Sequence, residues 1–179
     1  MSEPLSWLPA TDHSYLLAPA VARTVSELAV RGLRLEIAPV DPLAADTDDF
    51  CARYGHPLDR AVNCLVVSGR RGNDRRWAVC LAPASRRVDL KGVVCDRLEV
   101  RRISLVPMKE IFATGMVPGS VTPLGLPRGW PVLLDSALCD RTGLVIGGGL
   151  RSAKLRCDGR LLASLPGVQV VDDLVRSTT

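Results

Sequence analysis

The chain has 179 residues, of which 47% are hydrophobic and 23% are charged, and its formal net charge is +4. This is the composition of a soluble globular protein, long enough for one domain with a sizeable core and too short for two ordinary ones. No apolar run approaches the roughly 18 residues of a membrane span, and the acidic start of the chain lacks the basic-then-apolar pattern of a signal peptide, so we expect a cytoplasmic protein without a membrane partner.

The first half of the chain is predicted to alternate short helices with strands. Residues 1–18 show no clear periodicity and are expected to form an irregular lead-in to a single domain over 19–179. Further elements follow from apolar spacing, from Pro and Asp at helix starts and from Gly at helix ends. They are helices over 19–31 and 46–54, a half-buried strand over 33–40, and strands over 60–68 and 75–82 with a polar hairpin loop between them.

The second half continues this alternation. The expected elements are a helix over 89–98, a strand over 100–106, a helix over 107–115, strands over 131–135, 144–147 and 153–157, a helix over 158–165 and a last strand over 168–171. Strands interleaved with short helices predict a mixed α/β domain, built on one central mixed β-sheet with short helices around it.

The six cysteines lie 13 or more residues apart and never form a C-x-x-C pair. Cys64 and Cys80 fall inside apolar strand-like runs, which favours buried free thiols over a zinc site or disulfides. The only histidines are His13 and His56, and neither has neighbours that mark it as a catalytic base. We therefore expect no metal site, no cofactor, and no Ser-His-Asp or paired-carboxylate centre.

The positive charges are 20 Arg and 3 Lys, and their densest cluster flanks the predicted hairpin tip. Arginine suits bidentate contacts with phosphate, so this composition is compatible with an RNA partner. A solvated loop explains the cluster equally well, and the charge alone does not decide between the two. The cluster consists of Arg70, Arg71, Arg75 and Arg76.

The most informative segment is 114–125, T-G-M-V-P-G-S-V-T-P-L-G, with three glycines and two prolines in twelve positions. Such a stretch cannot continue a helix or lie inside a sheet, because proline removes a donor and glycine permits positive φ. It predicts a shaped loop whose amide N–H groups can bind a carbonyl oxygen or a phosphate. A rigid connector between a helix and a strand is the alternative interpretation.

The order of residues in this loop resembles the signature loop of the YbaK-like, prolyl-tRNA editing-domain family of aminoacyl-tRNA deacylases. Five further motifs are similar to that family and occur in its order. They are V-D-P at 40–42 followed by Thr47, A-V-N-C-L-V-V at 61–67, V-D-L-K at 88–91, P-V-L-L-D at 131–135, and V-I-G-G-G-L-R at 145–151. The resemblance covers about residues 41–173.

This resemblance implies a trans-acting enzyme that hydrolyses the 3′ ester of a mischarged aminoacyl-tRNA, most of all tRNA(Pro). It implies a mechanism without metal or protein nucleophile, in which the loop backbone holds the ester carbonyl and a terminal hydroxyl of the tRNA helps to position water. The implied catalytic group is Gly115, Pro118, Gly119 and Asn63. The implied substrate-binding group is Thr47, Ser120, Thr122, Gly147, Gly148, Gly149 and Arg151. We expect loop 115–125, Asn63 and Gly147–Gly149 to line one pocket.

The chain departs from the family pattern at Asn63, where the family strand has a lysine. Asparagine donates hydrogen bonds but carries no charge. Either another cation, Arg151 or Lys109, takes over, or the chain handles a different aminoacyl group. A non-catalytic tRNA- or aminoacyl-binding homologue is the alternative function, and a small-molecule hydrolase on the same scaffold is a third. The oligomeric state is left open by the sequence.

Overall fold

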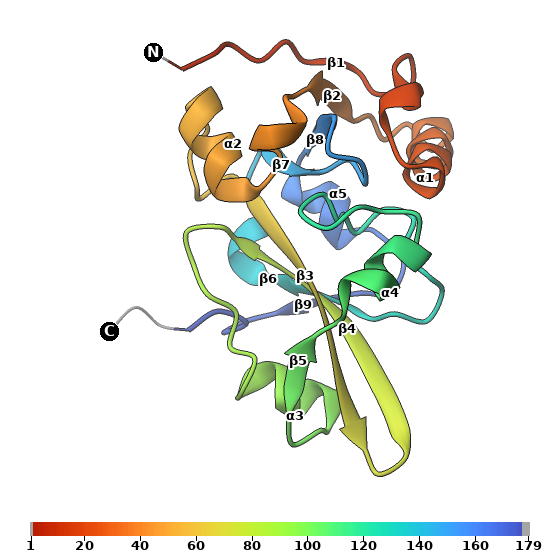
Figure 1. Ribbon diagram of the computed structural model, residues 1–179, viewed down its shortest axis with the longest axis vertical. Helices are drawn as coiled ribbons and strands as arrows, with labels where there is room; N and C mark the ends of the chain where they lie inside the picture. Colours follow the sequence, from red (N-terminus) through yellow and green to blue (C-terminus); the bar gives the residue numbers. More distant parts are fainter. Residues whose placement is uncertain (1, 177–179) are drawn as a thin grey trace.

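The computed structural model describes residues 2–176 and shows an α/β domain with two β-sheets (Figure 1). An antiparallel sheet has the strand order β1 (Leu8–Pro9), β2 (Glu36–Pro39), β8 (Ala153–Cys157) and β7 (Leu144–Gly147). A mixed sheet has the order β5 (Ile103–Leu105), β3 (Val62–Arg71), β4 (Asp74–Pro83), β6 (Val132–Asp135) and β9 (Val168–Val171).

Short helices surround these sheets. The α-helices are α1 (Pro19–Val30), α2 (Thr47–Tyr54), α3 (Val93–Leu98), α4 (Met108–Ala113) and α5 (Gly159–Ala163), and three 3-10 turns are η1 (Ser14–Leu16), η2 (Pro42–Ala44) and η3 (Ser136–Leu138). In Figure 1 the antiparallel sheet, α1 and α2 form the upper part of the molecule, and α3 and the tip of the β3–β4 hairpin form the lower part. None of the helices described here combines the length and apolar character needed to cross a membrane.

The predicted α/β class is confirmed, but the strands divide between two sheets where the sequence led us to expect one. Strand β2 pairs with β8, with Glu36 opposite Arg156, and this pair does not join the mixed sheet. The antiparallel strands therefore form a sheet of their own. The two sheets meet at one corner, because Ala61, just before β3, forms a parallel bridge with Val145 of β7. This corner brings the start of β3 close to β7.

The main core lies between the two sheets and is closed by α1. Its fully buried side chains include Ile37, Ile146 and Leu155 from the antiparallel sheet and Leu81 and Leu134 from the mixed sheet. Each such side chain stabilises the fold by about 1.5–3 kcal/mol through removal of apolar surface from water. All six cysteines are free thiols, four of them buried and two half-buried, as the sequence pattern indicated.

Several predicted elements are shorter or longer than expected, and two of these shifts have a local reason. The helix expected from residue 89 begins at Val93, because the Asp89 carboxylate accepts hydrogen bonds from the amides of Gly92 and Val93 at 3.2 and 3.4 Å. The hairpin strands extend to Arg71 and from Asp74, and Gly72, with φ of 59°, makes the tight turn. In the segment expected to be irregular, Leu8–Pro9 pairs with β2.

Candidate functional site

The glycine- and proline-rich loop 114–125 connects α4 to the segment that leads into β6. Its three glycines all have positive φ, with values of 80° at Gly115, 84° at Gly119 and 74° at Gly125. A side chain at these positions would be strained, so the backbone path depends on glycine. At Gly119 a Cβ atom would in addition collide with the Asp46 carboxylate and the Arg151 guanidinium.

The loop is fastened to the turn between β7 and β8 by backbone hydrogen bonds. The Val117 amide donates to the Gly149 carbonyl at 2.8 Å, and the Gly149 amide donates to the Ser120 carbonyl at 2.8 Å. Gly147 allows the close approach, because a Cβ atom there would collide with the backbone of Ser120. The glycines predicted near the substrate therefore also shape the contact between loop and sheet.

Arg151 fixes the loop from the other side. Its guanidinium donates to both carboxylate oxygens of Asp46, at 3.2 and 2.9 Å, and to the carbonyls of Pro42 at 2.9 Å and Pro118 at 3.3 Å. The hydrogen bond from Arg151 lowers the pKa of Asp46, although partial burial opposes this, and it raises the pKa of Arg151. The side chain is thus engaged with the protein, and its donors hold the loop against η2 and the start of α2.

A cavity of about 180 Å³ lies beneath the loop at the corner where the two sheets meet. The start of β3, the loop, the end of β7, β8 and the start of α2 all contribute to its wall. The lining residues are Asp46, Thr47, Val62, Asn63, Cys64, Leu65, Gly119, Val121, Gly147 and Lys154. Asn63, Thr47, Gly119 and Gly147 are therefore brought together, so the loop, the start of β3 and the end of β7 share one pocket.

Two backbone donors that the loop contributes to this cavity have no acceptor. In the part of the chain that the structure describes, the amides of Gly119 and Val121 make no hydrogen bond, while the Ser120 amide between them donates to the Val117 carbonyl at 3.0 Å. An unpaired N–H group in a partly enclosed site is costly unless a ligand or water accepts from it. The loop thus offers two donors at the wall of a small cavity.

Several residues predicted to contact the substrate do not line the cavity. These are Gly115, Pro118, Ser120, Thr122, Gly148, Gly149 and Arg151. Ser120 and Thr122 are 1% and 0% exposed, and their hydroxyl oxygens have no hydrogen-bond partner among residues 2–176. Their side chains pack inside the loop, so they affect the cavity by shaping the loop backbone and not by lining the cavity.

Lys154 also lines the cavity, although no sequence pattern pointed to it. It is only 5% exposed, and its Nζ donates to the Ala45 carbonyl at 2.5 Å and lies 5.4 Å from the centre of the Phe50 ring. Burial lowers its pKa to about 8, with the nearby Asp46 carboxylate acting in the opposite direction. The alternation of Ala153, Leu155 and Cys157 would place Lys154 in solvent, but η2 and α2 cover that face of β8.

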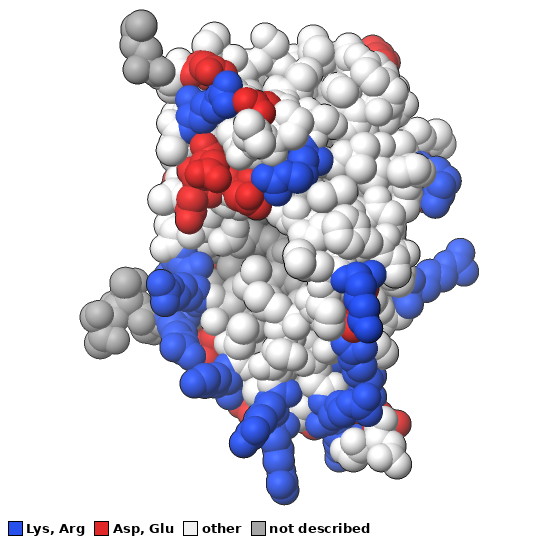
Figure 2. All heavy atoms as spheres, viewed as in Figure 1, with Lys and Arg blue, Asp and Glu red and all other residues white. Residues whose placement is uncertain are grey.

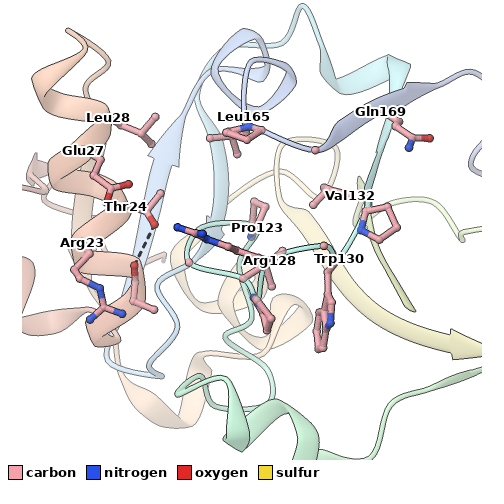
Figure 3. A pocket seen from close by; sticks show the side chains of 18 of the residues that line it. Arg23, Thr24, Glu27, Leu28, Pro123, Arg128, Trp130, Val132, Leu165 and Gln169 are labelled. Atoms are coloured by element: carbon pink, nitrogen blue, oxygen red, sulfur yellow. Dashed lines mark hydrogen bonds between the residues drawn. The ribbon is translucent and has the colours of Figure 1, made fainter. Parts of the chain in front are cut away.

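A larger cavity of about 900 Å³ lies along α1, beyond the other end of the loop (Figure 3). Arg23, Thr24, Glu27 and Arg128 are among the side chains around it. Of loop 114–125 only Pro123 and Gly125 line it, and none of the predicted site residues does. We therefore place the candidate site at the smaller cavity, where unpaired backbone donors and a buried cation lie together.

The charges are unevenly distributed over the molecule. Residues 69–110 carry 11 of the 23 Lys and Arg but only 5 of the 19 Asp and Glu, which gives this stretch a formal charge of +6 and the remainder −2. Figure 2 shows Lys and Arg gathered over the lower part of the molecule, where β3–β4, α3 and β5 lie in Figure 1, and acidic side chains gathered above. We call the region formed by residues 69–110 the basic half of the molecule. Its positive charge suits contact with a polyanion.

Comparison with known proteins gives a family and a fold. The profile of the aminoacyl-tRNA editing domain family matches residues 41–165. A solved structure provisionally described as a trans-editing enzyme for prolyl tRNA synthetase is 23% identical, with a TM-score of 0.71, over 90% of this chain and 99% of that chain. A structure from work on epitope grafting onto scaffold proteins is 24% identical with a TM-score of 0.72, over 90% and 100% of the two chains.

A third solved structure, of a protein described only as hypothetical, is 22% identical with a TM-score of 0.72 and covers 84% of this chain and 97% of that chain. At these identities the structures show a shared fold. The matched residues 41–165 include the loop, the start of β3, Gly147 and Lys154. All residues that line the small cavity therefore lie inside the matched region.

Proposed function

The chain belongs to the aminoacyl-tRNA editing domain family, and we propose that it is a trans-acting deacylase for a mischarged tRNA, tRNA(Pro) foremost. The observation that carries the proposal is the pair of unpaired amides, Gly119 and Val121, at the wall of the cavity that Asn63 and Gly147 also line. Two such donors form the kind of oxyanion site that ester hydrolysis requires.

In the proposed reaction, water attacks the carbonyl carbon of the 3′ ester, and negative charge develops on the carbonyl oxygen. The amides of Gly119 and Val121 donate to that oxygen, which stabilises the tetrahedral intermediate. The ester C–O bond then breaks, the ribose oxygen takes a proton, and the products are a free amino acid and an uncharged tRNA. The neighbouring ribose hydroxyl of the tRNA positions the attacking water.

The other predicted site residues have supporting roles in this proposal. Asn63 and Thr47 lie in the cavity wall, where their side chains can hydrogen-bond the substrate. Gly115, Pro118, Ser120 and Thr122 shape the loop that carries the two amides. Gly147, Gly148 and Gly149 allow the loop to approach the sheet, and Arg151 holds Pro118 and Asp46 in place.

The cavity size favours a small aminoacyl group. A volume of about 180 Å³ is below the roughly 300 Å³ at which pockets for drug-sized ligands begin. Besides its polar groups, the wall carries Val62, Cys64 and Leu65. We infer that a small aminoacyl side chain, such as that of alanine, serine or cysteine, fits and that bulky ones do not, with the nucleotide part of the tRNA outside.

The basic half of the molecule is the proposed contact for the tRNA backbone. Strand β3 passes from Asn63 at the cavity to Arg70 and Arg71 at the hairpin tip, which places the tip about 25 Å from the site at 3.3 Å per residue. An acceptor stem lying along this hairpin would bring its 3′ end to the loop. A tRNA substrate also supports the cytoplasm as the place of action.

The test is a deacylation panel. tRNA(Pro) charged in turn with Ala, Cys, Ser, Thr and Pro is incubated with catalytic amounts of the protein, and the ester half-life is measured. We expect one or more of the small mischarged amino acids to be lost faster than in buffer alone. Half-lives unchanged over this panel and over other tRNAs would rule out the deacylase function. The protein would then be the non-catalytic binding homologue that the replacement of the family lysine by Asn63 suggested.

A further inference from the structure

We propose that Lys154 is a substrate-contacting residue, whose ammonium group shares the ester oxyanion with the amides of Gly119 and Val121. The proposal rests on the proposed function for the identity of the substrate. Its basis is that Lys154 is the only Lys or Arg among the residues that line the small cavity. A reaction that creates negative charge in that cavity therefore meets one cation there.

The fold directs the Lys154 side chain toward the loop. Its neighbours on the adjacent strands are Ala38 of β2 and Gly147 of β7, both with little or no side chain. Residues directly opposite one another across a sheet present their side chains on the same face. The face of Gly147 is the one against which the Ser120 backbone packs, so the Lys154 side chain lies on the loop side of the sheet.

The ammonium has donors to spare. Its one hydrogen bond within residues 2–176 goes to the Ala45 carbonyl, and an ammonium group has three N–H donors. The nearest acid, Asp46, makes hydrogen bonds to Arg151 through both carboxylate oxygens. Among the described residues no carboxylate lies within ion-pair distance of Lys154. An incoming oxyanion would therefore find an ammonium with free N–H donors and no direct ion-pair partner.

The surroundings of Lys154 explain why it is still charged near neutral pH. The groups that face it are Asp46 before α2, Phe50 and Cys51 of α2, and Arg151 of the β7–β8 turn. Burial and Arg151 lower its pKa, while Asp46 raises it, and the outcome is a pKa of about 8. At pH 7 most of the molecules thus carry the ammonium in the cavity.

The experiment compares Lys154→Met with Arg156→Met, which removes a cation from the same strand outside the cavity. Arg156 pairs with Glu36 and takes no part in the proposed site. Single-turnover deacylation is measured with the aminoacyl-tRNA that wild type hydrolyses best, and affinity is measured with a 3′-amide analogue that cannot be hydrolysed. We expect Lys154→Met to slow the reaction about 10²-fold, as loss of one oxyanion donor does, with affinity changed less than threefold. Arg156→Met should keep the wild-type rate.

Two further readouts separate contact with the substrate from a structural role. Asn63→Lys added to Lys154→Met returns an ammonium to the same cavity, and we expect at least a tenfold recovery of rate. In wild type, the acceleration over spontaneous hydrolysis should fall as pH rises through about 8, because the protonated form acts. Because the α-amino group of the substrate also titrates near pH 8, the step is assigned to Lys154 by its absence in Lys154→Arg, whose side chain stays charged, and this variant also serves if Lys154→Met does not fold.

The outcomes keep the two proposals apart. Wild-type protein that hydrolyses no aminoacyl-tRNA contradicts the deacylase function itself. Active wild type with an unchanged Lys154→Met rate, or without a step near pH 8, contradicts only the role of Lys154. A rate loss that Asn63→Lys does not restore, together with weaker analogue binding, would assign Lys154 to holding the Ala45 carbonyl.

Discussion

The buried charge of Lys154 lowers the free energy of unfolding. Its pKa in the folded protein is about 8, below the ordinary 10.5, because burial disfavours the charged form. Between these two pH values the unfolded chain binds more protons than the folded protein does. The free energy of unfolding therefore rises with pH across this window, and the charged lysine costs stability below pH 8.

This linkage gives a prediction for the residue. A shift of this size corresponds to about 3 kcal/mol, so between pH 7 and pH 10.5 wild type should gain about that much stability relative to Lys154→Met. Chemical denaturation of both proteins at the two pH values measures the difference, which also cancels the titration of the other groups. Parallel pH dependences of the two proteins would show that the buried lysine is not strained electrostatically.

At the scale of elements, the loop 114–125 depends on its glycines in a way that can be isolated. Gly119 and Gly129 have nearly the same φ, 84° and 83°, so alanine suffers similar backbone strain at both positions. A Cβ atom at Gly119 would meet Asp46 and Arg151, whereas one at Gly129 meets nothing within 4 Å. Gly129→Ala is therefore a control that has the same backbone strain as Gly119→Ala but leaves the Asp46 and Arg151 side chains undisturbed.

We predict that Gly119→Ala slows deacylation by 10²–10³-fold, because the methyl group pushes away the Asp46 and Arg151 side chains that hold the loop at Pro118, and one oxyanion donor then leaves its position. Both variants should lose about 1 kcal/mol of stability from the left-handed backbone, and Gly119→Ala somewhat more. Single-turnover rates and thermal unfolding of the pair check this. Equal activity in the two variants would mean that the position of the Gly119 amide does not matter for the reaction.

Elements whose boundaries are set by local chemistry could be predicted from the sequence. Pro19 begins α1, and Val21, Val25 and Leu28 form its buried face, so the helix was recognisable by its spacing alone. The pairing of β2 with β8 joins residues about 120 positions apart, and no local pattern encodes it. For this reason the division into two sheets could not be predicted.

The same distinction holds for the site. The loop was predictable because the order of glycine and proline determines its backbone, and Asn63, Thr47, Gly119 and Gly147 do meet at one cavity. Ser120 and Thr122 were expected to bind substrate because of the resemblance to the family loop, but the fold buries their side chains and they do not line the cavity. Lys154 was missed because its burial depends on η2 and α2, which cover β8 from a distant part of the sequence.

At the scale of the whole molecule, the basic half should govern tRNA affinity and its salt dependence. Arg101 and Arg102 are exposed and, in the part of the chain described, have no carboxylate partner, unlike Arg71 and Arg76, which pair with Glu99. Each phosphate contact releases counterions and steepens the dependence of affinity on salt.

The prediction is that Arg101→Glu with Arg102→Glu raises KM about tenfold or more at low salt, without changing kcat. The slope of log KM against log salt concentration should fall by about 1–2, as two phosphate contacts are lost. Arg23→Glu with Arg31→Glu, beside the larger cavity, is the charge-matched control and should have a smaller effect. The same KM increase in both double variants would indicate a general charge effect in place of a tRNA-binding half.

The central claim, that the small cavity hydrolyses a mischarged tRNA, is tested most directly by the ester half-life of alanyl-tRNA(Pro) with catalytic amounts of wild-type protein. We predict a half-life at least tenfold shorter than in buffer, with prolyl-tRNA(Pro) under the same conditions less affected, as expected of an enzyme that removes mischarged amino acids. An unchanged alanyl-tRNA(Pro) half-life, with no other mischarged tRNA hydrolysed, would contradict the account.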